Sequence, residues 1–376
     1  MVAADRDRGG GPPLVRVAVG LALALVLALA GWIAIFGTPD GGEPVFVADI
    51  PPEPEIAVEP DGLPIRATVP PEHAIPGEDM LPDGDGDAVR IIDPSAGMTR
   101  AEEEIELARA PVASLVEPSE FGLLPRIGEG GRTPAEVYAR PARQLADGPG
   151  APVRAALVVT GLGISASGTS DAIARLPGDV SLAFAPYGTE LQSWVDRARS
   201  DGHEVFLQVP MEPFDYPDND PGPHTLLTSL EAGDNLDRLH WLLGRFAGYV
   251  GITNYMGARL TSDAEALRPI MREIAARGLS YLDDGASSRS QAPELALSLA
   301  TPAATADVAI AADEPREAVL EALSRLEEIA KEHGQALAVA TALPVTIDAI
   351  SEWIAGLEGR GVVLIPASAL INDRTS

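Results

Sequence analysis

The chain contains no cysteine among its 376 residues, and histidine, aromatic and basic residues are also scarce. The lack of cysteine excludes disulfides, thiolate nucleophiles, cysteine-based zinc sites and iron–sulfur clusters. Only five histidines occur, so a histidine-based metal site would have to draw on these few. Lysine and arginine number 27 against 56 aspartates and glutamates, which gives a formal net charge of −29. A chain this negative repels phosphate backbones, and we therefore expect no nucleic-acid partner.

One long stretch has no charged residue at all. Residues 17–36 read VAVGLALALVLALAGWIAIF, and at 1.5 Å per residue such a helix spans the roughly 30 Å hydrocarbon core of a bilayer. Arginines precede it at positions 6, 8 and 16, and the next basic residue is Arg66. The positive-inside rule then predicts a cytoplasmic N-terminus over residues 1–16 and export of the remainder. We expect a single-pass anchor in a bacterial inner membrane with a periplasmic C-terminal domain; a cleaved signal peptide, whose apolar region is shorter, is the alternative.

The next segment, residues 37–150, is rich in proline and in acidic side chains. Eighteen of the 34 prolines fall within it, and PPEPE at 51–55 is typical of its composition. Such a segment buries too little apolar area to offset its conformational entropy, and charge repulsion keeps it extended. We predict a disordered acidic stalk over 37–150. A partner-recruiting role for this stalk would make the chain an envelope interaction protein, which is one alternative function.

From residue 151 to residue 376, strand-like apolar runs alternate with helix-period segments. The expected strands are 153–160, 180–186, 204–210, 249–253, 279–283, 307–310, 335–341 and 362–365. The expected helices are 171–176, 190–200, 236–246, 264–277, 316–332 and 347–357. Near-continuous apolar strands separated by helices indicate a parallel sheet covered on both faces. Seven or eight such repeats in about 225 residues favour an α/β fold of the irregular (β/α) barrel type, with its site at the carboxyl ends of the strands.

The polar residues at these expected strand ends define the candidate site. The sequence has no Gly-x-Gly-x-x-Gly, Gly-x-Ser-x-Gly or His-Glu-x-x-His motif. His224 lies in a proline-rich loop and is the histidine best placed to fold over the strand ends. Glu212 and Asp283 are the candidate catalytic residues, because two carboxylates would suit glycoside chemistry. The candidate binding cleft consists of Thr160, Gln208, Glu212, Asn254, Tyr255, Asp283 and Thr341.

Several short motifs in this region occur in a characteristic order. They are Gly202-His203-Glu204-Val205, Val209-Pro210-Met211-Glu212-Pro213, Asn254-Tyr255-Met256-Gly257, and Arg277-Gly278-Leu279 with Leu282-Asp283. In order and spacing, residues 153–371 resemble the divergent polysaccharide deacetylase family. The resemblance implies an irregular (β/α) barrel and carbohydrate esterase chemistry. In that chemistry, a divalent metal held by aspartate and histidine activates water and polarises an acetamide carbonyl.

The sequence departs from the family pattern where the metal would be bound. Thr160-Gly161 replaces the aspartate pair, Gln208 and Tyr255 each replace a histidine, Ala340-Thr341 replaces Gly-His, and Ala311 replaces an aspartate. These side chains offer a divalent metal essentially no ligands, so we predict no metal site and no metal cofactor.

The leading hypothesis that follows is a membrane-anchored, extracytoplasmic pseudoenzyme of envelope carbohydrate metabolism. It would bind envelope polysaccharide or peptidoglycan fragments and would hold the membrane through residues 17–36. The main alternative is a carbohydrate hydrolase or deacetylase that retains activity through Glu212 or Asp283.

Overall fold

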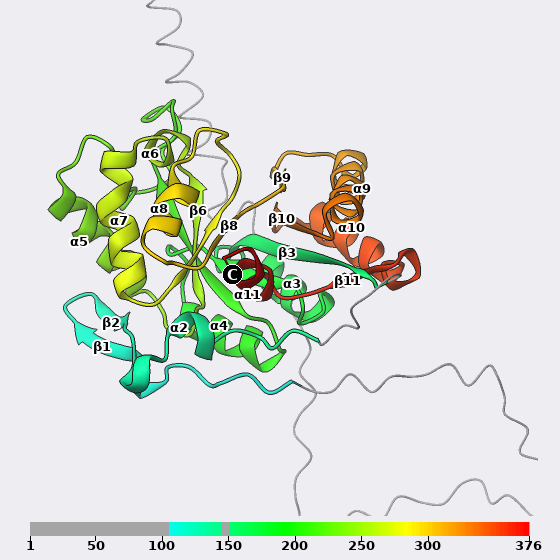
Figure 1. The fold of residues 1–376 in the computed structure, drawn as a ribbon, viewed down its shortest axis with the longest axis horizontal. Helices are drawn as coiled ribbons and strands as arrows, with labels where there is room; N and C mark the ends of the chain where they lie inside the picture. Colours follow the sequence, from blue (N-terminus) through cyan, green and yellow to red (C-terminus); the bar gives the residue numbers. More distant parts are fainter. Residues whose placement is uncertain (1–104, 144–150, 376) are drawn as a thin grey trace, which may run out of the picture. The chain divides into compact units, whose positions relative to one another are not determined.

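The computed structural model describes residues 105–143 and 151–375, and a nine-stranded parallel sheet forms its centre (Figure 1). The strands are β3 (Val153–Leu162), β4 (Ser181–Phe184), β5 (Val205–Met211), β6 (Gly251–Met256), β7 (Ser280–Asp283), β8 (Ala303–Thr305), β9 (Val308–Ile310), β10 (Gln335–Thr341) and β11 (Val362–Leu364). Each pairs in parallel with its neighbours in this sheet, which confirms the predicted α/β class.

The order of the strands shows how the sheet curves. They follow the sequence β8-β7-β6-β5-β4-β3-β10-β9, and β11 pairs with the start of β3. Strands β8 and β9 therefore lie at opposite ends of the ladder, although only Ala306 and Asp307 separate them in the chain. A two-residue link holds the two edges close together, and the sheet forms an incomplete (β/α) barrel. The short strand β8 was absent from the sequence prediction.

Helices follow most strands and cover the outside of the sheet (Figure 1). They are α3 (Ala166–Arg175), α4 (Leu191–Ser200), α5 (Ala232–Leu243), α6 (Ala258–Thr261), α7 (Ala264–Ala276), α8 (Ala292–Ser298), α9 (Arg316–His333) and α10 (Pro344–Ala355), with a 3₁₀ turn at Glu358–Arg360. Helix α9 illustrates why these helices cover the sheet. Its residues Val319, Leu323 and Leu326 recur at helical spacing, form one apolar face, and are fully buried against the sheet. The six helices expected from the sequence are all present, with ends displaced by a few residues.

The inner face of the sheet has a separate apolar core. Ala156 and Val158 of β3 belong to it, whereas Leu157 and Val159 belong to the outer core beneath the helices. The last helix, α11 (Ala367–Thr375), lies within the curve of the sheet and buries Leu370 and Ile371 in the inner core (Figure 1). Apolar side chains of β3 therefore fill both cores, and polar side chains gather at the carboxyl ends of β3, β5 and β10, where Thr160, Gln208 and Thr341 lie.

The predicted disordered stalk is wrong for residues 105–143, which fold against the barrel. This segment, called the collar below, contains β1 (Val116–Ser119), β2 (Gly122–Pro125), α2 (Pro134–Val137) and two 3₁₀ turns at Ala113–Leu115 and Glu129–Gly131. Its Leu115 and Tyr138 are buried in the inner core, and its Leu124 is buried in the outer core. The composition argument failed here because a few well-spaced apolar residues are enough when a preformed surface completes their burial.

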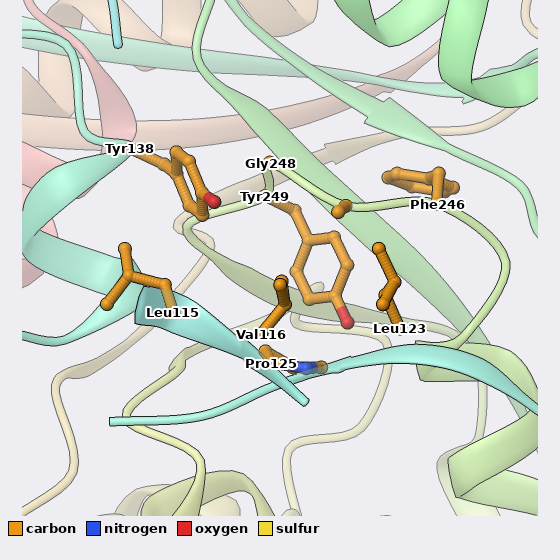
Figure 2. Close-up of a pocket in the computed structure, with 9 residues that line it drawn as sticks. Leu115, Val116, Leu123, Pro125, Tyr138, Phe246, Gly248 and Tyr249 are labelled. Atoms are coloured by element: carbon orange, nitrogen blue, oxygen red, sulfur yellow. The ribbon is translucent and has the colours of Figure 1, made fainter. Parts of the chain in front are cut away.

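Arginine side chains hold the collar in place. The Arg199 guanidinium donates to the carbonyl oxygens of Ala108, Tyr138 and Gly248 at 2.8–3.1 Å, and Arg277 pairs with Glu117 at 3.1 Å. Figure 2 shows Leu123 and Pro125 of the collar beside Tyr249 and Phe246 of the barrel around a small pocket. The pocket has about 10 Å³ of space, which is too little for a ligand, so this contact is a packed interface.

The other predicted N-terminal features lie outside the described residues. These are the cytoplasmic segment 1–16, the membrane anchor 17–36, and the stalk at 37–104 and 144–150. Within residues 105–143 and 151–375, no helix has the length and apolar character needed to cross a bilayer.

Candidate functional site

The candidate site lies at the carboxyl ends of the strands, on the inner face. Residues two apart on a strand point to the same face of the sheet. Thr160 of β3, Gln208 of β5 and Thr341 of β10 therefore lie on the inner face, because the residues two positions before them (Val158, Phe206 and Val339) belong to the inner core. Tyr255 of β6 pairs in register with Pro210, two residues beyond Gln208. The structure therefore brings together on one face four of the residues that replace family ligands: Thr160, Gln208, Tyr255 and Thr341.

Two of these side chains, Thr160 and Gln208, are hydrogen-bonded to neighbouring strand ends. Thr160 and Thr341 are register partners, and the Thr160 hydroxyl donates to the Ala340 carbonyl at 3.3 Å. The Gln208 amide oxygen accepts the N–H of Gly161 at 3.1 Å, which ties β5 to the end of β3. Gln208 is 6% exposed, so this hydrogen bond between β5 and β3 lies inside the barrel, away from solvent.

This arrangement does not fit a divalent metal. Metals in such sites take histidine nitrogens or carboxylate oxygens, whereas these four positions carry two threonine hydroxyls, one amide and one phenol. The amide oxygen, which is the best ligand among them, already accepts a backbone hydrogen bond. Among the residues that the structure describes, no three histidine, aspartate or glutamate side chains are grouped to hold a metal.

Glu212, a predicted catalytic candidate, is buried and fully engaged. Its carboxylate accepts hydrogen bonds from the N–H and the hydroxyl of Thr228 at 2.5 and 2.7 Å, and Arg259 lies 3.4 Å away. The Glu212 carbonyl also accepts the N–H groups of Arg259 and Leu260. Glu212 therefore connects the loop after β5 to the start of α6, which is a structural role.

Asp283, the second catalytic candidate, is 2% exposed and organises the loop after β7. Its carboxylate accepts the Gly285 N–H at 2.9 Å and the Ser290 hydroxyl. Asn254 supports the same loop, because its side-chain oxygen accepts the Asp284 N–H at 2.9 Å and its amide group donates to the Met256 carbonyl at 2.7 Å. The structure thus brings Asn254 and Asp283 together around the β7 end.

The neighbouring Asp284 has the perturbed carboxyl of this site, although the sequence prediction did not place it in the cleft. Burial raises the pKa of Asp284 to about 6, and the Asp283 carboxylate adds to the rise. The Ala286 N–H and the Asn254 side chain act in the opposite direction by stabilising the charged form. The adjacent aspartates at a strand end were the available sequence signal. The fold buries Asp283 and leaves Asp284 half-buried, and the raised pKa belongs to Asp284.

Exposed apolar side chains mark the same end of the barrel. Tyr255 is 42% exposed at the end of β6, and Phe214 and Ile164, in the connections after β5 and β3, are 52% and 60% exposed. The Arg289 guanidinium lies 4.8 Å from the Phe214 ring centroid. These groups offer apolar faces next to polar strand ends, which is a combination that suits the ring of a sugar.

His224 stacks on Trp241 of α5, with ring centroids 3.6 Å apart and an interplanar angle of 2°. Burial lowers the pKa of its imidazole, and Arg238 and Arg245 lower it further. The stacking fixes the loop after β5 against α5 and holds the imidazole on that helix.

A curved parallel sheet with polar strand ends on its inner face defines the class of polysaccharide deacetylase-type (β/α) barrels. The model of the divergent polysaccharide deacetylase family matches residues 157–371, and this chain belongs to that family.

Relatives of known sequence or structure agree with this assignment. Uncharacterized protein YibQ of Escherichia coli (strain K12) is 22% identical over 202 residues, which cover 54% of this chain and 62% of YibQ. An uncharacterized protein of Haemophilus influenzae is 23% identical over 189 residues, covering 50% of this chain and 66% of that protein. The matches thus span a little under two thirds of the length of these curated relatives. The crystal structure of uncharacterized protein ATU2773 from Agrobacterium tumefaciens C58 has 43% identity and a TM-score of 0.62, and covers 66% of this chain and 99% of that one.

Proposed function

We propose that this chain is a glycan-binding, non-catalytic member of its family that lacks the metal-dependent deacetylase centre. The observation that carries the proposal is the engagement of Gln208, whose oxygen accepts the Gly161 N–H where the family pattern has a metal-binding histidine. Thr160, Tyr255 and Thr341 supply only hydroxyl groups around it, and such groups bind divalent cations weakly.

The proposed ligand is envelope polysaccharide or a peptidoglycan fragment. The family membership supports a carbohydrate ligand, and the exposed Tyr255 ring at the barrel mouth offers a face for a sugar ring. The apolar stretch 17–36 supports anchoring in a bacterial inner membrane with the barrel in the periplasm. This location would bring the barrel close to the polymers that it is proposed to bind.

The proposal is tested on the purified full chain in detergent. Zinc titration by calorimetry should give no signal at micromolar concentrations, and N-acetylated chitooligosaccharides should release no acetate with or without zinc. Peptidoglycan fragments should bind, and Tyr255→Ala should weaken the binding by roughly two- to tenfold through the lost stacking contact. Leu123→Ala is the matched control, because Leu123 is similarly exposed (39%) but lies on the collar. Stoichiometric zinc binding or acetate release would refute the proposal.

A hydrolase remains the second candidate because of Asp284. Its carboxyl pKa of about 6 leaves it partly protonated near neutral pH, as a general acid requires. Glu212 and Asp283 are less suited, since both carboxylates are held by hydrogen bonds within their own loops. If any turnover of a glycan is detected, Asp284→Asn should abolish it and Glu212→Gln should spare it; the reverse result would return Glu212 to the catalytic role.

A further inference from the structure

Three aromatic rings and two arginines gather where the connections after β4 and β5 meet helix α5. Tyr187 follows β4, His224 follows β5, and Trp241 lies on α5. The Trp241 ring stacks on the His224 imidazole, and its centroid lies 6.1 Å from that of the Tyr187 ring. Arg238 precedes Trp241 by three residues and Arg245 follows it by four, which is the spacing of neighbours on a helix surface. These five residues, called the arginine flank below, have no part in the function proposed above.

The two guanidinium groups of the flank are held in place but are not neutralised. Arg245 Nε donates to the Pro186 carbonyl at 2.9 Å, and Arg238 donates to the Thr225 carbonyl. An arginine has five N–H donors, so each keeps donors free after one such bond. Neither has a carboxylate partner among the residues that the structure describes, whereas Arg277 pairs with two glutamates. The flank therefore carries uncompensated positive charge on a chain whose net charge is −29.

Both charges converge on one pair of stacked rings. The Arg245 guanidinium carbon lies 4.8 Å from the centroid of the Trp241 ring, which stacks on His224. Burial lowers the pKa of His224, and the charges of Arg238 and Arg245 lower it further, so both guanidinium groups lie close to this imidazole. The imidazole is then uncharged at neutral pH, and the positive charge belongs to the two arginines. Arg245 is exposed, and Arg238 and Trp241 are partly exposed, so a dissolved molecule can reach them.

The chemistry of these groups favours a carboxylate. The planar guanidinium fork matches the two oxygens of a carboxylate, and Tyr187 adds a partly exposed ring beside it. Burial raises the pKa of Tyr187 and the Asp220 charge adds to the rise, which places one carboxylate of the chain near this ring. The Asp220 carboxylate, however, accepts the Gly222 N–H at 2.9 Å and pairs with neither arginine. The two guanidinium groups thus remain available to a carboxylate from outside.

We propose that the arginine flank binds the carboxylate of an acidic saccharide. A single carboxylate suits two uncompensated guanidinium groups, whereas the acidic remainder of the chain would repel a polyanion. The saccharide part of the proposal rests on the proposed glycan function, and the preference for a carboxylate rests on the flank itself. Arg238 and Arg245 then determine specificity, because they distinguish an acidic sugar from its neutral counterpart.

The test uses the full chain in detergent and two sugars that differ by one lactyl carboxylate, N-acetylmuramic acid and N-acetylglucosamine. In NMR titrations, the acidic sugar should bind roughly fivefold or more tightly than the neutral one. Arg238→Gln and Arg245→Gln should each weaken binding of N-acetylmuramic acid by roughly fivefold and leave that of N-acetylglucosamine unchanged. Arg268→Gln, on the exposed face of α7, is the matched control and should change neither affinity.

Two measurements on the unaltered chain test the same site without a substitution. Raising NaCl from about 50 mM to about 500 mM should weaken binding of the acidic sugar alone, because salt screens exposed charges. Bound N-acetylmuramic acid should raise the pKa of His224, since its carboxylate offsets the two arginines that lower it. An NMR pH titration of the imidazole measures this rise, and an unchanged His224 pKa would place the sugar elsewhere and overturn the proposal.

The outcomes also separate the arginine flank from the barrel mouth. Binding of N-acetylmuramic acid that persists in Tyr255→Ala and weakens in both arginine variants supports the flank, even if the mouth binds no glycan. Binding that is lost in Tyr255→Ala and kept in both arginine variants overturns the flank and leaves the proposed function intact. Equal affinity for the two sugars, or no binding of the acidic one, overturns the flank whatever the mouth binds. Displacement of the sugar by equimolar inorganic phosphate would show a general anion site and overturn the saccharide assignment.

Discussion

At the scale of single residues, the site depends on which polar groups are already used. Gln208 and Glu212 occupy prominent positions at the end of β5, yet hydrogen bonds to Gly161 and Thr228 employ both of them in holding loops together. Asp284 differs, because its carboxyl is half-buried and carries a raised pKa. Residue type alone would have ranked Glu212 and Asp284 equally.

The raised pKa of Asp284 predicts a specific pH dependence of stability. Its folded-state pKa of about 6 exceeds the ordinary value of 3.8, so the folded state binds the proton more tightly than the unfolded state. The associated stabilisation is complete below pH 3.8 and is lost as the pH rises through 6. Asp284→Asn should therefore raise the free energy of unfolding at pH 7 by about 1–3 kcal/mol, relative to its effect at pH 4. Urea unfolding at both pH values measures this difference, and an equal effect at pH 4 and pH 7 would contradict it.

At the scale of elements, the collar shows how short segments gain structure from a neighbour. The hairpin β1–β2 has only four residues per strand and would be marginal alone, but it packs on α5, and Arg277 pairs with its Glu117. Arg199, on α4, is 4% exposed and binds backbone carbonyls at both ends of the collar. Burial lowers the pKa of its guanidinium to about 10, so the group stays charged at neutral pH.

Removing this charge should release the collar. Arg199→Met keeps most of the side-chain volume but leaves the carbonyls of Ala108, Tyr138 and Gly248 without their donor. We expect a loss of about 2–4 kcal/mol in the free energy of unfolding and faster amide hydrogen exchange across 105–143. Arg268→Met on the exposed face of α7 is the control and should change stability by less than about 0.5 kcal/mol. Unchanged exchange in the collar of Arg199→Met would refute the anchoring role.

At the scale of the whole molecule, the folded unit begins before the barrel. The inner core includes Leu115 and Tyr138 of the collar together with Ile371 of α11, so both ends of the described chain contribute to one core. A chain starting at residue 151 should therefore unfold at a lower temperature than one starting at 105, because it lacks the buried Leu115 and Tyr138 side chains of that core. Thermal unfolding followed by circular dichroism compares the two, and equal midpoints would show that the collar adds nothing to stability.

The sequence by itself determined the parallel α/β class, most strands and helices, and the substitutions at 160, 208, 255 and 341. These depend on local hydrophobic period and on residue identity, which are readable along the chain. Strand β8, the folding of the collar and the burial of Asp284 were decided by the tertiary structure alone. Each depends on contacts with residues that are distant in the sequence. Pro302 and Ala306, which flank β8, are hydrogen-bonded to Tyr281 and Asp283 of β7, and Arg199 is hydrogen-bonded to the collar. Whether a side chain is free or engaged is a property of its neighbours in space, because hydrogen bonding and desolvation act between residues that the fold brings together.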